Sequence, residues 1–412
     1  MKIIAIEKKI DHGMVRLTGH VQLGGGGELK PFFEFPEQFS SFVAENADPF
    51  VAALLVPSMA CGEDLEIAPS ISRRLWGNLP QFQEIFNAWY PDTMKPIRVI
   101  AEHFHGKGPK NDFVGSFFSL GVDSFHTLLR HEKEFPGRER ITHLIYMTGF
   151  EVPLREFTDG REMPVLESVL EAARIWDKEA ICGRTNLRDC FPIDWRQYHG
   201  SVLAATALSL SGGMGKALIP SSTTWNSMVP WGSHHLIDPL WSSDDLEVFH
   251  DGTADARVRK IVNTILDQPE AMRLLRVCTN KRGGSGNCGF CEKCLRTMIT
   301  LEIAGALQSC GSFPPKLPRD FWRRMKFKAA FVDANLRFAL EKQAPAWIIE
   351  GLERALALGP LEELRKKRGD WGFSVDLFRL AFEKTIGRLI LYPDKIRRKR
   401  IRPPKPPVTN IK

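Results

Sequence analysis

Between residues 112 and 220 the chain alternates short apolar runs with helix-like segments, and this alternation limits the folds it can adopt. The first run, Phe113–Phe118, is apolar almost throughout, as expected for a strand buried on both faces of a sheet. Helices and strands are then predicted in alternation at 124–131, 141–147, 164–176, 179–183, 201–210 and 217–220. Strands joined by helices form a parallel sheet with right-handed crossovers. The sequence therefore predicts an α/β domain over residues 111–300.

The segments on either side of this domain have a different character. Residues 1–110 are predicted to form a β-rich accessory module, in which Gly24–Gly27 is a turn and Phe50–Met59 a buried strand. Residues 301–394 are predicted to be a helical C-terminal region. Its helix-spaced apolar segments are 321–340, 347–358 and 374–391. Residues 395–412 are basic and then proline-rich, which predicts a disordered tail.

The net charge of +7 comes from 56 basic and 49 acidic residues, and eight of the basic residues lie in the last eighteen. The body of the protein is therefore close to neutral, which excludes a chain that coats nucleic acid, whereas the tail could still contact a polyanion locally. No apolar run reaches the roughly 18 residues of a membrane helix. The first residues lack the features of a signal peptide. We expect a cytoplasmic protein with reduced cysteines.

The segment Ser119-Leu120-Gly121-Val122-Asp123-Ser124 joins the first apolar strand to the helix that follows. Such a turn presents backbone N–H groups at a helix N-terminus, where phosphate binds. Gly121 allows close approach of a phosphate, the hydroxyls of Ser119 and Ser124 can donate hydrogen bonds, and the Asp123 carboxylate could hold Mg²⁺. The residues predict a phosphate-binding loop. The alternative is an ordinary helix cap made by the same side chains.

Four of the eight cysteines, Cys278, Cys288, Cys291 and Cys294, are close together in the sequence. In a reducing compartment this density indicates a metal before a disulfide. Four thiolates with no open position predict a closed, structural zinc site. An iron–sulfur cluster uses the same ligands and is the alternative.

The loop resembles the S-G-G-x-D-S signature of the PP-loop ATP pyrophosphatase superfamily, with Leu120 in place of the first glycine. A PP-loop domain followed by one cysteine and then C-x2-C-x2-C is similar to the 7-cyano-7-deazaguanine synthases, or QueC-like proteins, over about residues 112–300. The resemblance implies a PP-loop (adenine nucleotide α-hydrolase-like) sheet, with ATP and Mg²⁺ at the loop and Zn²⁺ on the four cysteines. It assigns catalysis to Asp123 and Ser124, and contacts with the nucleotide base to Met147 and Gly149.

The activity implied by this resemblance is that of an ATP-dependent carbon–nitrogen ligase. A substrate carboxylate, carried in one candidate by a deazapurine, attacks the α-phosphate and pyrophosphate leaves. An amine then displaces AMP to give an amide or, after a second activation, a nitrile. One alternative is a tRNA-thiolating PP-loop enzyme that uses Cys182 and Cys190. Another is a non-catalytic ATP-binding component of a multi-protein defence system. The argument for it is that Leu120 replaces the first glycine of the loop signature. The partners that stay open are another protein, a second copy of this chain in a homodimer, and nucleic acid bound to the tail.

Several further side chains are weaker candidates for the site. His234, His235 and Asp238 lie in a polar loop, where one histidine could act as an acid or base; simple packing of the loop is the alternative. His103 and His105 could hold a metal, although their Gly-containing segment favours a solvated linker. The carboxyl edge of the sheet, where ligands of open sheets bind, supplies Arg184, Arg188 and Ser221–Thr224.

Overall fold

The computed structural model describes residues 1–108, 111–135, 137–157, 163–278, 286–325 and 329–358. The helix predicted at 374–391 and the tail predicted to be disordered at 395–412 lie outside these residues. Among the helices of the described ranges, none has the length and apolar character that crossing a bilayer requires.

The α/β prediction is confirmed by five parallel strands, which pair in the order β13-β12-β9-β10-β11. Their bounds are β9 (Phe113–Phe117), β10 (His143–Thr148), β11 (Glu179–Thr185), β12 (Met214–Pro220) and β13 (Glu247–Asp251). The first of them in the chain, β9, lies between β10 and β12, so the chain proceeds outward from β9 in both directions. This is the strand order of a doubly wound sheet, in which ligands bind beyond the carboxyl ends of the strands, where the direction reverses.

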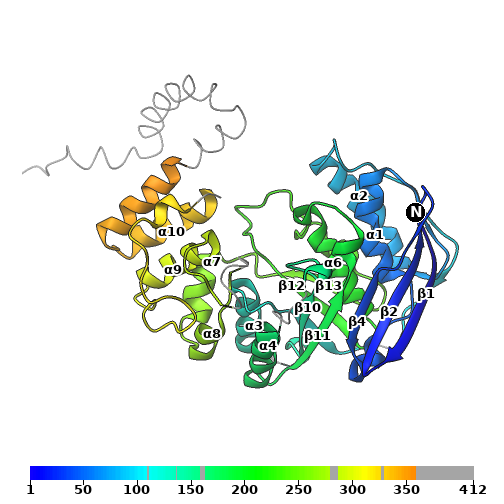
Figure 1. The fold of residues 1–412 in the computed structure, drawn as a ribbon, viewed down its shortest axis with the longest axis horizontal. Coiled ribbons are helices and arrows are strands. Elements are labelled where there is room, and N and C mark those ends of the chain that lie inside the picture. The colour runs from blue at the N-terminus through cyan, green and yellow to red at the C-terminus, as the bar shows by residue number, and fades with distance from the viewer. Residues whose placement is uncertain (109–110, 136, 158–162, 279–285, 326–328, 359–412) are drawn as a thin grey trace, which may run out of the picture.

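The N-terminal strands extend the same sheet. β4 (Phe32–Pro36) pairs antiparallel with β11 and with β2 (Met14–Gln22), so the hydrogen-bonded ladder crosses the boundary predicted near residue 110 (Figure 1). Within the described residues the sheet has eleven strands. The others in this part are β1 (Lys2–Asp11), β3 (Glu28–Leu29), β5 (Leu65–Ile67) and β7 (Val99–Ala101). The predicted turn at Gly24–Gly27 links β2 to β3. The division into domains stays a prediction.

Helices cover both faces of the sheet (Figure 1). α1 (Asp48–Cys61), α2 (Arg73–Trp89) and α6 (Trp195–Ser209) pack on one face, and α3 (Val122–Glu134) and α4 (Met163–Ile175) on the other. Successive residues of β10 enter different cores: Ile145 belongs to the first, which also holds N-terminal residues, and Leu144 to the second. Burial on both faces explains why these strands are apolar without alternation.

One sequence prediction is wrong: the run Phe50–Met59 forms most of helix α1, not a strand. A continuous apolar run fits a buried helix as well as a buried strand, and its length decides between them. Pro49 stands in the first turn, Gly62 ends the helix in the left-handed conformation (φ 67°), and every residue from Asp48 to Met59 is buried.

The helical prediction for the C-terminal region is confirmed in the part that is described. α7 (Arg257–Lys260), a π-helical turn (Ile261–Ile265) and α8 (Pro269–Leu274) lead to the cysteines. α9 (Glu292–Ile303), α10 (Ala329–Glu341) and the helical residues 346–358 follow. In place of the one helix predicted at 321–340, a short 3₁₀ turn at Phe321–Arg323 precedes α10. These helices share the core of α3 and α4.

Candidate functional site

A cavity of about 310 Å³ lies beyond the carboxyl ends of β9, β10 and β12, at the point where the strand order reverses. The loop between β9 and α3 forms one wall of it, through Ser119, Gly121, Asp123 and Ser124. Met147 from β10 and Ser222 after β12 form others. The structure thus brings together most of the residues that the sequence predicted for phosphate and base binding.

The loop holds its shape through its own hydrogen bonds. The Ser124 hydroxyl donates to the Gly121 carbonyl (3.0 Å) and accepts from the Ser119 amide (3.3 Å). Ser124 therefore fixes the loop, and this contact is compatible with the cap alternative as well as with phosphate binding. Gly121 is the N-cap residue of α3, so the first amides of this helix begin at the cavity wall.

Leu120 occupies the position where the family signature has a glycine, and its backbone is left-handed (φ 62°). Glycine adopts this conformation without strain, whereas leucine pays a steric cost. Here the Leu120 side chain is 1% exposed within the second core, and its carbonyl accepts a hydrogen bond from the Arg276 amide (2.8 Å). Burial of the side chain offsets the strain, so the loop keeps a conformation that suits glycine.

Asp123 is held by two cations. Its Oδ2 accepts from Arg257 (2.9 Å) and its Oδ1 from Lys260 (3.2 Å). Burial alone would raise the pKa of this carboxyl, but the charges of Lys260 and Arg257 outweigh it and hold the pKa below its usual range. Lys260 also donates to the Ser221 carbonyl (2.5 Å) and so joins the loop to the end of β12. The role of Asp123 as a magnesium ligand stays a prediction.

Basic side chains outnumber acidic ones in the lining of the cavity. Four of them line it, against two acidic ones, Asp123 and Glu151; the basic ones are Arg257, Arg276, Lys293 and Arg296. Arg296 is 9% exposed, and burial, with the nearby charge of Arg257, lowers its pKa to about 10. The buried Nε atoms of Arg257 and Arg296 have no hydrogen-bond partner among the described residues. Cations that are buried beyond the number of their counter-ions favour an anionic ligand.

Sequence reasoning missed all of these basic residues, together with Lys260. Nothing in their spacing separates them from the other lysines and arginines of the chain, because they come from α7, α9 and the segment before the cysteines. The one usable signal is position: Lys293 lies between Cys291 and Cys294, and Arg296 is the second residue after Cys294.

The four cysteines converge, as the sequence predicted. Their sulfur atoms all lie within 4.8 Å of one another, and two pairs, Cys278–Cys291 and Cys288–Cys294, are 3.8 Å apart. Tetrahedral zinc with Zn–S bonds of about 2.3 Å requires sulfurs about 3.8 Å apart. The Cys291 amide also donates to the Cys288 sulfur (3.3 Å). The cluster therefore fits one ion such as Zn²⁺.

The cysteine cluster also positions part of the cavity wall. Cys291 is the N-cap residue of α9, and Cys294 lies in its first turn. The same helix carries Lys293 and Arg296 to the cavity. A metal on the cysteines would fix the start of α9, and through it two of the cations.

The other predicted residues lie outside the cavity lining. Gly149 (φ 101°) packs so tightly that a Cβ would lie 2.1 Å from the Thr185 carbonyl oxygen, which explains the glycine without a ligand. Arg184 pairs with Glu34 of β4 and so connects the N-terminal strands to β11. Arg188 donates to the Phe150 carbonyl (3.0 Å) and lies over the Trp195 ring. Both arginines have structural contacts, and their ligand contacts stay a prediction.

The polar loop with the two histidines packs as its alternative predicted. Asp238 is fully buried and accepts from Ser233 (2.7 Å) and the His234 amide (3.2 Å), and it contacts His250 (2.7 Å). Burial lowers the pKa of His234 to about 4, so its imidazole is neutral at physiological pH. These residues stabilise the fold beside α6.

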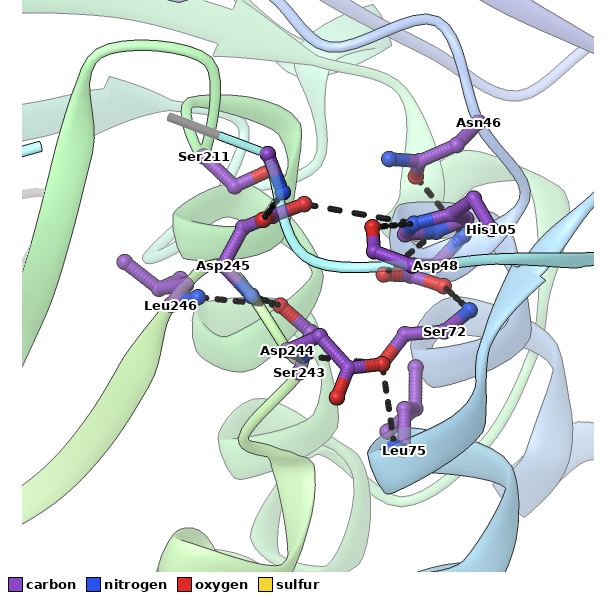
Figure 2. A network of polar contacts seen from close by, with 12 residues as sticks. Asn46, Asp48, Ser72, Leu75, His105, Ser211, Ser243, Asp244, Asp245 and Leu246 are labelled. Carbon is purple, nitrogen blue, oxygen red and sulfur yellow. Dashed lines mark hydrogen bonds and ion pairs between the residues drawn. The ribbon is translucent and has the colours of Figure 1, made fainter. Parts of the chain in front are cut away.

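His105 belongs to a buried polar network and not to a solvated linker, which corrects that prediction (Figure 2). Its Nε2 lies 3.3 Å from Oδ2 of Asp48, which is fully buried at the start of α1. Asp48 also accepts from the Ser72 amide (2.8 Å), and Asp245 lies on the other side of the imidazole. The nearby Asp48 carboxylate raises the pKa of His105, although burial opposes it.

A larger cavity, of about 680 Å³, opens at the opposite ends of β10 and β11, beside Thr142 and Glu179. Two of its basic side chains pair with one carboxylate: Lys178 contacts Glu132 (2.7 Å), and Arg140 contacts Glu132 as well (2.9 Å). Size alone therefore does not select the site. The smaller cavity has the loop, the excess of cations and the position at the reversal of strand order.

Comparisons with protein-family models, with curated proteins and with solved structures give no match to this chain.

Proposed function

We propose that this protein is an ATP-dependent ligase that forms AMP and pyrophosphate, adenylates a substrate carboxylate and transfers an amine to it. The observation that carries the proposal is the cavity at the reversal of strand order. There the Ser119–Ser124 loop, at the N-terminus of α3, faces four basic side chains. A polyanion that approaches this loop meets backbone amides on one side and guanidinium groups on the other.

The chemistry needs positioning and charge more than a protein nucleophile. The carboxylate oxygen of the substrate attacks the α-phosphorus of ATP, the bond to the β-phosphate oxygen breaks, and pyrophosphate leaves with the electron pair. An amine then attacks the acyl carbon, loses its proton and releases AMP. Arg276 and Lys293 would neutralise the leaving pyrophosphate. Mg²⁺, when bound, would supply further charge neutralisation at the phosphates, and Asp123 is the loop carboxylate that would hold it.

Two rival functions have less support. A thiolating enzyme needs reactive thiolates, whereas burial raises the pKa of Cys182 to about 12 and that of Cys190 to about 11. The hypothesis of a non-catalytic nucleotide-binding protein rested on Leu120 in place of a glycine. The backbone of Leu120 is left-handed, which is the conformation that suits a glycine at this position. The resemblance to QueC-like proteins, including a deazapurine acid as substrate, remains part of the proposal.

The test is ATP–pyrophosphate exchange with a panel of carboxylic acids that includes 7-carboxy-7-deazaguanine. We expect radioactive pyrophosphate to enter ATP only when one of these acids is present, because the adenylation step is reversible. Exchange without any acid, or ATP binding with no exchange for any acid, would contradict a carboxylate-activating ligase. The second result would favour the non-catalytic alternative.

A further inference from the structure

A second cavity, of about 410 Å³, adjoins the loop cavity and is built largely by the C-terminal region. The two cavities have Ser222, Arg257 and Arg296 in common. The far wall of the second cavity is α10, which packs against α7 and α9 (Figure 1). α10 lies outside residues 112–300, on which the family resemblance rests, so this cavity is not explained by the loop or by the cysteines.

The charges around the second cavity are mostly neutralised among themselves. Arg259 pairs with Glu341, and Arg337 pairs with Asp333 (2.8 Å). At the shared wall Arg257 pairs with Asp123 (2.9 Å) and Arg296 with Glu292 (3.4 Å), but the buried Nε atoms of both arginines have no hydrogen-bond partner among the described residues. The side chain of Arg296 is 10% exposed. An anionic group is therefore favoured at one end of this cavity, next to the loop.

The rest of the cavity is suited to a flat, partly polar body. The Phe331 ring borders it with its centroid 4.1 Å from the Arg296 guanidinium carbon, and Phe338 borders it from the next turns of α10. The opposite side has hydroxyl and amide groups from the loop after β12, including Thr224 and Asn226. Aromatic rings on one side and hydrogen-bonding groups on the other suit an aromatic or heteroaromatic ring.

We propose that this second cavity binds the carboxylic acid that is to be adenylated, and that the acid is a small aromatic or heteroaromatic carboxylate. Its ring lies against Phe331 and Phe338, and its carboxylate lies at Arg257 and Arg296, which also border the loop cavity. The inference rests on the proposed function, since the shared arginines place the carboxylate next to the phosphates of ATP. It assigns α10 of the C-terminal region to the choice of substrate.

The experiment is isothermal titration of the full chain with indole-3-carboxylate and with its neutral counterpart, indole-3-carboxamide. We expect the acid to bind at least tenfold more tightly than the amide. Ala334→Trp fills the cavity from α10 and is expected to abolish binding of the acid. Ala329→Trp places the same side chain at the exposed start of α10, outside the cavity lining, and is expected to bind the acid as the unmodified protein does.

Binding of α,β-methylene-ATP, which cannot be cleaved to AMP, is measured on the same proteins and separates the two proposals. The second-cavity proposal is supported if Ala334→Trp loses the acid, binds the nucleotide with unchanged affinity and melts at the same temperature as Ala329→Trp. Failure of the acid to bind, equal affinity for acid and amide, or equal affinity of the two tryptophan variants for the acid would overturn it. Failure of the unmodified protein to bind the nucleotide would instead overturn the proposed function.

Discussion

Asp123 is expected to contribute to stability as well as to ligand binding, because its charge compensates two cations. Replacing it as Asp123→Asn leaves Arg257 and Lys260 without their carboxylate, and we expect a loss of about 2 kcal/mol at pH 7. Urea unfolding measures this loss. Glu134→Gln, which removes an exposed pair with Arg130 on the same helix, is the control and should cost less than about 0.5 kcal/mol.

The pH dependence of this loss follows from the lowered pKa of Asp123. The contribution is present above the pKa of an unfolded aspartate, about 3.9, and disappears as the pH falls through the still lower folded value. The difference between the unmodified protein and Asp123→Asn should therefore be constant from pH 6 to 8 and shrink below pH 4. A difference that is largest in acid would contradict this assignment of charge.

The pair of His105 and Asp48 should show the opposite pH dependence. Asp48 raises the pKa of His105, so the contribution is complete below the unfolded histidine value, about 6.5, and is lost as the pH rises through the folded one. We expect His105→Asn to cost about 1 kcal/mol at pH 6 and less at pH 9, as measured by urea unfolding. A cost that grows with pH would refute the pairing.

The sequence predicted elements well where a single pattern decided them and poorly where two patterns compete. β9 and the Ser119–Ser124 loop follow from an apolar run that meets a turn and a helix. The strand prediction for Phe50–Met59 failed because a nearly continuous apolar run shows no clear period, and only its length favours a helix over a strand. Long-range pairings such as β4 with β11 have no local signal at all. The basic residues of the cavity were missed for the same reason.

Helix α9 makes the metal site and the cavity depend on each other. We expect one zinc per chain by elemental analysis, and Cys291→Ser should lose it, lower the melting temperature and weaken nucleotide binding, because Lys293 and Arg296 follow Cys291 on α9. Cys61→Ser, at an exposed cysteine far from the cluster, is the control and should change none of these. If metal-free protein binds the nucleotide with full affinity, the metal site and the cavity are independent of each other. A brown protein that contains iron would show that the four cysteines hold an iron–sulfur cluster and not zinc.

The molecule as a whole should unfold as one cooperative unit through the central sheet. The first core contains residues of β4 and α1 as well as of β10 and β12, and Glu34 contacts both Arg16 and Arg184. Removing residues 1–110 would expose the edge of β11 and one face of the sheet to water. We expect the shortened chain to be insoluble or unfolded by circular dichroism. A folded fragment that binds ATP would establish the N-terminal part as a separate module.

The fate of a substrate oxygen atom tests the central claim most directly. An acid that supports pyrophosphate exchange is labelled with ¹⁸O in its carboxylate and incubated with ATP, the protein and ammonium, and the released AMP is analysed by mass spectrometry. Adenylation joins a carboxylate oxygen to the α-phosphorus, so transfer of the acyl group to the amine leaves one ¹⁸O in AMP. We predict AMP that carries one label per amide formed, together with pyrophosphate. Unlabelled AMP, or release of ADP and phosphate, would contradict the account.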